Sequence, residues 1–535
     1  MRGNFENTGK LIRFILRRER VMSTVWIAIL LLFSVALAPM MDGMFDDVSR
    51  AVYAETMNNP AMVAMMGPVY GADNYTAGAM YSNAMLLWVI ITVAVMNIFL
   101  VIRHTRADEE KGRTEVVRSL PTGRLANLSA TLIVAVVVNT ILALLTGLGI
   151  AVMGIESMGL MGSLVYGAAL GASGLFFAAV AALFAQLSSS GRGAVGLSLV
   201  TLGVVYLMRA AGDMNSEALS LASPMGLVQR AQIYVANYWW PILVLLLEVA
   251  VVMAVAYALN AVRDMDQGFI HAKPGRKDAP SSLKSSFGLA FRLQRNTIIV
   301  WVFSLFILGA AYGAVLGDID AFVASSDFYS QIVGSNPNFT TSQMFVSMVT
   351  AIMSLIALAP VLMAITKPGS EEKDGRVEHV LSRAVSRVKY LSGHLVLALA
   401  ASVLVQAAIA VGIFVAAASV LPDPGDLTLG YLLQANLVYL PAVWVMIGVA
   451  VLLIGLWPKA SVAIWGYYGF VFFASFMGRM PDLLPEWINK LSPYGYIPQL
   501  PVDSINYPTL AVLVAVAAVL VAGGVVFYRR RDIAT

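Results

Sequence analysis

The chain has 535 residues, of which 59% are hydrophobic and only 12% are charged, and its formal net charge is +4. Soluble domains carry roughly 25% charged residues, so this composition excludes an ordinary water-soluble protein and indicates a surface that mostly faces lipid. Cysteine is absent, which excludes disulfides, thiolate metal sites and cysteine nucleophiles. The four histidines do not have the spacing of a zinc site.

Apolar runs long enough to cross a bilayer recur along the whole chain. They predict twelve spans, at 22–40, 84–103, 126–153, 160–186, 192–210, 239–260, 297–316, 345–366, 394–421, 430–457, 460–478 and 508–528. The runs at 192–210 and 460–478 are rich in Gly, Ala and Ser and give the weakest signals. Pro39 directly follows a motif that resembles a signal-peptidase site, so the first run is predicted to be a retained span.

The positions of lysine and arginine test this map, because cytoplasmic loops of membrane proteins are enriched in both residues. If the N-terminus is cytoplasmic, all but five of the 35 fall in predicted cytoplasmic segments. The five are Arg50, Arg209, Arg230, Arg479 and Lys490. We therefore predict both termini in the cytoplasm, and we attribute the positive charge to topology, with no nucleic-acid partner.

Two charged segments match each other without gaps, each after the second span of its half. Residues 108–124 read DEEKGRTEVVRSLPTGR, and residues 371–387 read EEKDGRVEHVLSRAVSR. We call them the two repeated segments. They predict an all-α membrane protein built as two parallel six-helix halves, with a pseudo-two-fold axis along the membrane normal.

The leaders of the two halves correspond as well, since Arg17 and Arg20 match Arg292 and Arg295. In the first leader Arg13 shares a face with these arginines and apolar residues occupy another face, which predicts an amphipathic helix at the inner membrane interface. A basic topology anchor explains the same pattern. The predicted organisation is an interfacial helix at 1–21, a six-span half at 22–260, a linker with a second interfacial helix at 261–296, a six-span half at 297–528 and a tail at 529–535.

Each repeated segment is predicted to contain a short helix that begins with acidic residues, as the helix dipole favours. A small apolar stripe on such a helix suits a groove of a cytoplasmic partner, and the alternative is a solvated charged loop. The Gly-Arg-x-Glu pattern in both halves favours the partner surface. Its predicted residues are Glu109, Glu110, Gly112, Arg113, Glu115, Val116, Val117 and Leu120, and then Glu372, Gly375, Arg376, Glu378, Val380 and Leu381.

This pattern resembles the coupling segment of ABC-type exporter permeases, and its duplicated form resembles the bacterial multidrug and polyketide-antibiotic (tetronasin-type) exporter permeases. The resemblance implies alternating-access export of hydrophobic or amphiphilic compounds across a bacterial plasma membrane. It also implies two copies of a separate ATP-binding subunit that hold ATP and Mg. The second segment departs from the pattern, because Ala384 and Ser386 replace Pro121 and Gly123, so weaker or asymmetric coupling is expected there.

The chain itself has no glycine-rich loop of the kind that cradles phosphates, so we expect it to bind no cofactor and not to be an enzyme. The alternative function is a gradient-driven, proton-coupled transporter of the major facilitator type, which also has twelve spans in two parallel halves. The charged segments here are too long for the tight loop of that group, although residues 374–376 are similar to its Asp-Gly-Arg pattern.

Several polar residues lie inside the predicted spans and are candidates for the translocation path: Glu248, Asn97, Asn139 and Gln406. An acid such as Glu248 costs ~2.5–3.5 kcal/mol at the centre of a span. It is therefore interpreted either as a cation site or proton carrier, or as a hydrogen-bonded helix contact. The amides are interpreted mainly as interhelical hydrogen-bonding groups. Pro360 and Pro441 are predicted to kink their helices.

The long external stretches carry two further patterns. Residues 41–83 are rich in methionine, for which packing, contact with apolar substrates and Cu(I) binding are the alternatives. Residues 211–238 and 479–507 are rich in Tyr and Trp, which indicates an aromatic belt at the outer interface or, alternatively, an external gate.

Overall fold

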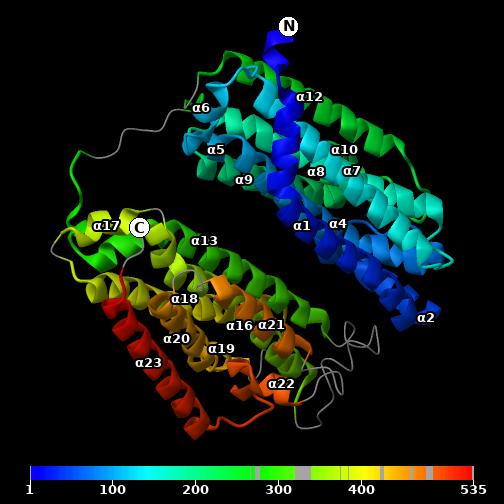
Figure 1. The fold of residues 1–535 in the computed structure, drawn as a ribbon. Coiled ribbons are helices and arrows are strands. Elements are labelled where there is room, and N and C mark those ends of the chain that lie inside the picture. The colour runs from blue at the N-terminus through cyan, green and yellow to red at the C-terminus, as the bar shows by residue number, and fades with distance from the viewer. Residues whose placement is uncertain are drawn as a thin grey trace. The chain divides into compact units, whose positions relative to one another are not determined.

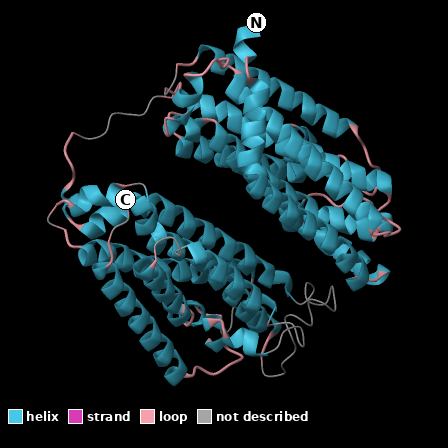
Figure 2. Ribbon diagram, viewed as in Figure 1, coloured by secondary structure: helices cyan, strands magenta, loops and turns pink. Residues whose placement is uncertain are grey.

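The computed structural model describes residues 2–264, 267–270, 277–319, 339–373, 375–383, 385–421, 427–457, 462–477 and 486–532. In these ranges the chain folds into helices and forms no β-sheet (Figure 2). It divides into two compact units, Met1–Gly275 and Arg276–Thr535. The division falls inside the predicted linker, and each unit is described by itself below.

Six helices of the first unit are long and apolar enough to cross a membrane (Figure 1). They are α1 (Thr8–Met44), α4 (Ala77–His104), α7 (Ala126–Val152), α8 (Leu160–Leu187), α9 (Gly191–Asn215) and α12 (Trp240–Val262). The centre of the unit is α8, which packs against α4, α7, α9 and α12. Short helices follow at the two ends: α5 (Arg106–Glu110) and α6 (Arg113–Arg118) at one, and α2 (Asp47–Met57), α3 (Pro60–Met66), α10 (Glu217–Leu221) and α11 (Pro224–Gln229) at the other.

The second unit contributes five further helical segments of spanning length. They are α13 (Ser286–Val315), α16 (Thr341–Lys373), α18 (Arg387–Val420), α19 (Leu429–Leu437) together with α20 (Leu440–Leu456), and α23 (Tyr507–Arg530). Here α16 and α18 form the centre. The shorter elements are α17 (Arg376–Leu381), α22 (Glu486–Lys490) and the 3-10 helix η6 (Pro493–Tyr496).

The prediction of an all-α membrane protein is confirmed, with eleven helices of spanning length among the described residues. The remaining predicted span, 460–478, coincides with α21 (Ala463–Met477), an apolar helix of 15 residues that is shorter than the others. Part of that predicted range lies outside the described residues. The twelve-span layout and the cytoplasmic position of both termini stay predictions.

The structure also tests the predictions for the two leaders and for the prolines inside the spans. The predicted interfacial helix at 1–21 is continuous with the first span, because α1 runs unbroken from Thr8 to Met44, and its position at the membrane interface stays a prediction. The 37 residues of α1 reach roughly 55 Å at 1.5 Å per residue, longer than the bilayer core. In the same way Arg292 and Arg295 lie inside α13. The helix is interrupted between α19 and α20, just before Pro441, as expected for a residue that lacks an N–H donor, whereas α16 continues through Pro360.

Candidate functional site

The two repeated segments adopt the same local conformation. In each, a glycine in the left-handed region precedes a six-residue helix: Gly112 has φ 69° before α6, and Gly375 has φ 71° before α17. Residues other than glycine rarely adopt this φ. In each unit the segment lies at one end of the helix bundle, near the N-terminus for α6 and near the C-terminus for α17 (Figure 1).

Equivalent ion pairs anchor the two segments inside their units. In the first, Glu109 accepts a hydrogen bond from Arg263 at the end of α12, at 2.7 Å, and both side chains are buried. In the second, Glu372 accepts one from Arg531 at the end of α23, at 2.6 Å. Each segment is thereby joined to the last span of its own unit.

A second ion pair closes the turn around each glycine. Arg113 donates to Asp108 at 3.0 Å, and Arg376 donates to Glu371 at 3.1 Å. These pairs bridge the glycine and hold the short helix against α5 in the first unit and against the end of α16 in the second. Arg113 and Arg376, which the sequence assigned to the partner surface, therefore also have a structural role.

Further contacts fix the far end of each segment. Arg124 donates to the carbonyl oxygen of Arg263 at 2.8 Å, and Arg387 donates to those of Arg529, at 3.3 Å, and Arg531. Cations are stabilised at the C-terminal ends of helices, where carbonyl groups lack partners. Glu110 has a different role, because it accepts from the backbone N–H of Gly191 at 3.0 Å and so caps α9.

The outward faces of the two short helices differ in chemistry. On α6, Glu115 is exposed beside Val116 and Leu120, which are 68% and 60% exposed, while Val117 is half-buried. The corresponding exposed residues of the second segment include Glu378, with His379 and Arg383 at the positions of Val116 and Leu120. Val380 and Leu381 are half-buried, and Val377 is buried against its unit. Ala384 lies outside the described residues.

A buried polar network that the sequence analysis missed connects α1 to α6. Glu19 is 3% exposed and accepts hydrogen bonds from Arg103, at 2.8 Å, and His104, at 2.7 Å. Arg18 donates to Asp108 at 3.0 Å, the same carboxylate that holds Arg113. The sequence contained one signal for this network, namely Glu19 among the arginines of the leader. A buried carboxylate needs cationic partners.

The second unit has a neutral counterpart of this network. Gln294 corresponds to Glu19 through the match of the two leaders, and it bonds with Nδ1 of His394 at 3.0 Å. A neutral amide avoids the free-energy cost of burying a charge, so Gln294 needs no cationic partner at this position. Arg13, Arg17 and Arg20, like Arg292 and Arg295, point away from these networks and are exposed.

An apolar cavity of about 270 Å³ lies next to the first repeated segment. Its apolar lining comes from Leu11, Phe14 and Ile15 of α1 and from Val116 and Val117 of α6, and its polar lining includes Arg18, Asp108 and Arg113. The cavity therefore continues the exposed apolar face of α6, and it offers room for an apolar side chain of another molecule.

Comparison with known proteins identifies the family. The model of the family described as multidrug efflux system permease Rv1217c, C-terminal domain, matches residues 10–260 and 283–529. The multidrug efflux system permease protein Rv1217c of Mycobacterium tuberculosis (strain ATCC 25618 / H37Rv) is 34% identical over 546 residues, which cover 99% of this chain and 96% of the relative. The chain belongs to the Rv1217c-type permease family. Together with its apolar helices, this membership makes it a multi-pass membrane protein.

In this Rv1217c-type permease, the amides proposed for the translocation path lie inside helix contacts. Asn97 and Asn139 are fully buried between α4 and α7 and bond to each other twice, at 3.0 and 2.6 Å. Gln406 of α18 is also buried and donates to Ser354 of α16 at 2.6 Å. In this structure all three hold helices together, which was the principal interpretation from sequence.

Glu248 has a different environment from the amides. It lies partly exposed on α12, next to Leu247 and Val251, which are 65% and 57% exposed. No hydrogen bond or ion pair joins it to another described residue of the permease. The structure thus places Glu248 on the outer surface of its own unit and leaves both interpretations of its function open. Over the described part of the chain, no group of acidic residues and histidines is arranged to hold a metal ion.

Proposed function

We propose that this permease is the transmembrane subunit of an ATP-driven ABC exporter that moves hydrophobic or amphiphilic, drug-like compounds out of a bacterial cell. The observation that supports this most directly is the pair of repeated segments, each with an exposed acid at its tip (Glu115 and Glu378) and a buried acid at its base (Glu109 and Glu372). A solvated loop needs no such anchoring. The printed name of the relative, a multidrug efflux system permease, supports the substrate class.

Energy for transport is proposed to come from two copies of an ATP-binding partner, with ATP and Mg held by the partner. The chain carries no phosphate-binding loop of its own. One docking segment in each half accounts for two partner copies on a single permease chain. On this proposal the permease is not itself an enzyme.

The anchoring contacts suggest how movement of the partner reaches the spans. A force on α6 acts on α5 through Asp108, which also accepts from Arg18 of α1, and Glu109 of α5 passes it to the end of α12. In the second unit, α17 acts on α16 through Glu371 and on α23 through Glu372. The pairs of Glu109 with Arg263 and of Glu372 with Arg531 are largely buried. Buried ion pairs are costly to break, so each segment and the end of the last span of its unit move as one body, as alternating access requires.

The two docking sites are proposed to differ in strength. The first offers Val116, Leu120 and the adjoining cavity of about 270 Å³ to an apolar side chain of the partner. The second offers His379 and Arg383 at the equivalent positions. Apolar burial stabilises association, so we expect the first segment to contribute more of the binding energy.

The mass of the intact complex, purified gently from its native membrane, tests the proposal. One permease chain with two ATP-binding subunits is the expected composition. Two permease chains in the complex would overturn the stoichiometry. A permease without any ATPase, with proton-dependent transport that fails on Glu248→Gln, would favour the gradient-driven alternative.

A further inference from the structure

The ends of the two units opposite the repeated segments follow a common plan. The motif Ser-Pro-x-Gly occurs at 223–226 and again at 492–495, 269 residues later. In both copies the glycine packs against the preceding short helix: a Cβ there would lie 2.2 Å from the carbonyl oxygen of Ser220, or 2.4 Å from that of Asn489. Ser220 and Asn489 are also 269 residues apart. The two ends can therefore be compared position by position.

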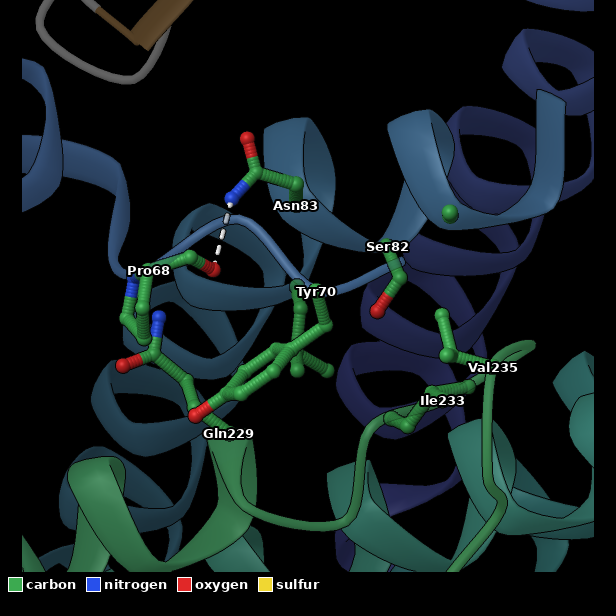
Figure 3. Close-up of a pocket in the computed structure, with 9 residues that line it drawn as sticks. Pro68, Tyr70, Ser82, Asn83, Gln229, Ile233 and Val235 are labelled. Atoms are coloured by element: carbon green, nitrogen blue, oxygen red, sulfur yellow. Dashed lines mark hydrogen bonds between the residues drawn. The ribbon is translucent and has the colours of Figure 1, made fainter. Parts of the chain in front are cut away.

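In the first unit, tyrosine rings fill this end. Tyr81, Tyr166 and Tyr234 form a buried cluster with ring centroids 5.4, 6.3 and 6.5 Å apart. The pocket beside the cluster is only about 20 Å³, lined in part by Tyr70 and Gln229 (Figure 3). That volume holds roughly one water molecule, so this pocket has no room for an organic ligand.

In the second unit, other residues stand at the positions of Tyr81 and Tyr234. Met344 stands at the offset of 263 residues from Tyr81 that relates the repeated segments, and Asp503 stands 269 residues after Tyr234. A cavity of about 340 Å³ occupies this region and is lined by both residues. Its volume falls within the range of roughly 300–1,000 Å³ that is typical of small-molecule sites.

The lining of this cavity combines one carboxylate with aromatic and polar groups. Asp503 is the charged side chain among the described lining residues, and the backbone N–H of Gln499 holds its carboxylate in place at 2.9 Å. Ser347 lines the cavity, is 3% exposed, and its Oγ has no hydrogen-bond partner among the described residues. Tyr439 and Tyr494 line it with stacked rings 5.9 Å apart.

These groups match the recognition of one chemical class. Tyr439 and Tyr494 place aromatic rings in the wall of the cavity. Aromatic faces attract organic ammonium groups, and such sites recognise quaternary ammonium ligands. Asp503 adds an opposite charge, and the thioether of Met344 adapts to apolar substituents. A neutral ligand of the same shape would gain nothing from the carboxylate.

We propose that this cavity of the second unit, with Asp503 at its rim, is a binding site for organic ammonium cations. The site deepens the proposed function by naming a substrate class, and its part in transport rests on that function. Binding to the cavity does not, because the residues that form it belong to one unit and need neither ATP nor a partner.

Equilibrium binding of benzyltrimethylammonium to the purified full-length chain in lipid nanodiscs, without ATP, tests the site. We expect saturable binding that Asp503→Asn weakens about two- to fivefold, since Asp503 is exposed and exposed charge pairs are weak. Met344→Tyr, which restores the residue of the first unit, should fill the cavity and abolish binding. Asp73→Asn, an exposed acid of the first unit, is the matched control and should bind as the unmodified chain does. Neutral neopentylbenzene, of similar shape, should fail to compete.

Equal affinity in Asp503→Asn, Met344→Tyr and the control would overturn the proposal, as would the absence of binding to the unmodified chain. Met344→Tyr provides a second measurement if Asp503→Asn does not fold, and the elution volume of each variant in gel filtration reports folding. Binding without any associated ATPase would overturn the proposed ATP-driven function alone, and an ATPase-coupled permease without this binding would overturn the site alone.

Discussion

Replacing Glu109 by alanine separates the structural role of a repeated segment from its contact role. Glu109 lies 2.7 Å from Arg263 and 3.1 Å from Arg106, and all three side chains are at most 7% exposed. The substitution removes the carboxylate that compensates two buried cations. Breaking a buried ion pair by removing one partner costs about 3–5 kcal/mol, so the free energy of unfolding should fall by about that amount.

The matched variant is Glu115→Ala, six residues along the same segment. Glu115 is exposed, and exposed charges contribute about 0–1 kcal/mol, so the stability of this variant should stay close to that of the unmodified chain. Unfolding in sodium dodecyl sulfate, followed by tryptophan fluorescence, measures both. The double variant Glu109→Ala/Arg263→Ala should lose less stability than the sum of its single changes, because the two groups interact directly.

Equal stability of Glu109→Ala and Glu115→Ala would refute this reasoning. That result would mean that the segment is not anchored through its buried acid and that the contact with α12 has no mechanical role. This holds whether both variants keep their stability or both lose it, because Glu115 makes no buried contact comparable to that of Glu109.

Three further outcomes follow from the geometry. Gly112→Ala should cost about 1–2 kcal/mol, because the left-handed conformation is strained for L-residues, and chemical unfolding measures this. Asn139→Leu should destabilise the first unit by about 1 kcal/mol or more, because Asn97 loses both of its bonds to that side chain; loss of transport at full stability would instead assign the pair to the path. Glu248→Gln should leave ATP-dependent export in proteoliposomes unchanged, and abolished export would assign Glu248 to the transport step.

Much of the fold was predictable because membrane insertion is governed by local composition. Each spanning helix needs an apolar run, and cytoplasmic loops need cations, so both signals are read directly from the chain. The continuity of α1 was missed, although no glycine or proline occurs from Lys10 to Ala38 to end the helix. The basic leader looked like a separate element because its polarity changes, but a change of polarity does not stop a helix.

The candidate site was predictable only in part. The repeat of Gly-Arg-x-Glu located both short helices, and the left-handed glycine explains why that pattern recurs. The pairing of Glu109 with Arg263, across 154 residues, depends on how the helices pack. No local pattern contains that information, and so Arg263 and Arg531 were interpreted only as topology signals. The cavity lined by Met344 and Asp503 was not predicted either, because its walls come from segments far apart in the chain.

Partner-dependent ATP hydrolysis is the measurement that tests the central claim most directly. The complex would be purified with the permease carrying Glu115→Arg, Glu378→Arg or, as the control, Asp73→Arg. Charge reversal at an interface disfavours the original partner, so we predict that substrate-stimulated hydrolysis falls at least about tenfold with Glu115→Arg and less with Glu378→Arg, while the control is unaffected. Undiminished hydrolysis with both reversals combined would contradict the account, because the two repeated segments would then not be where the ATPase acts.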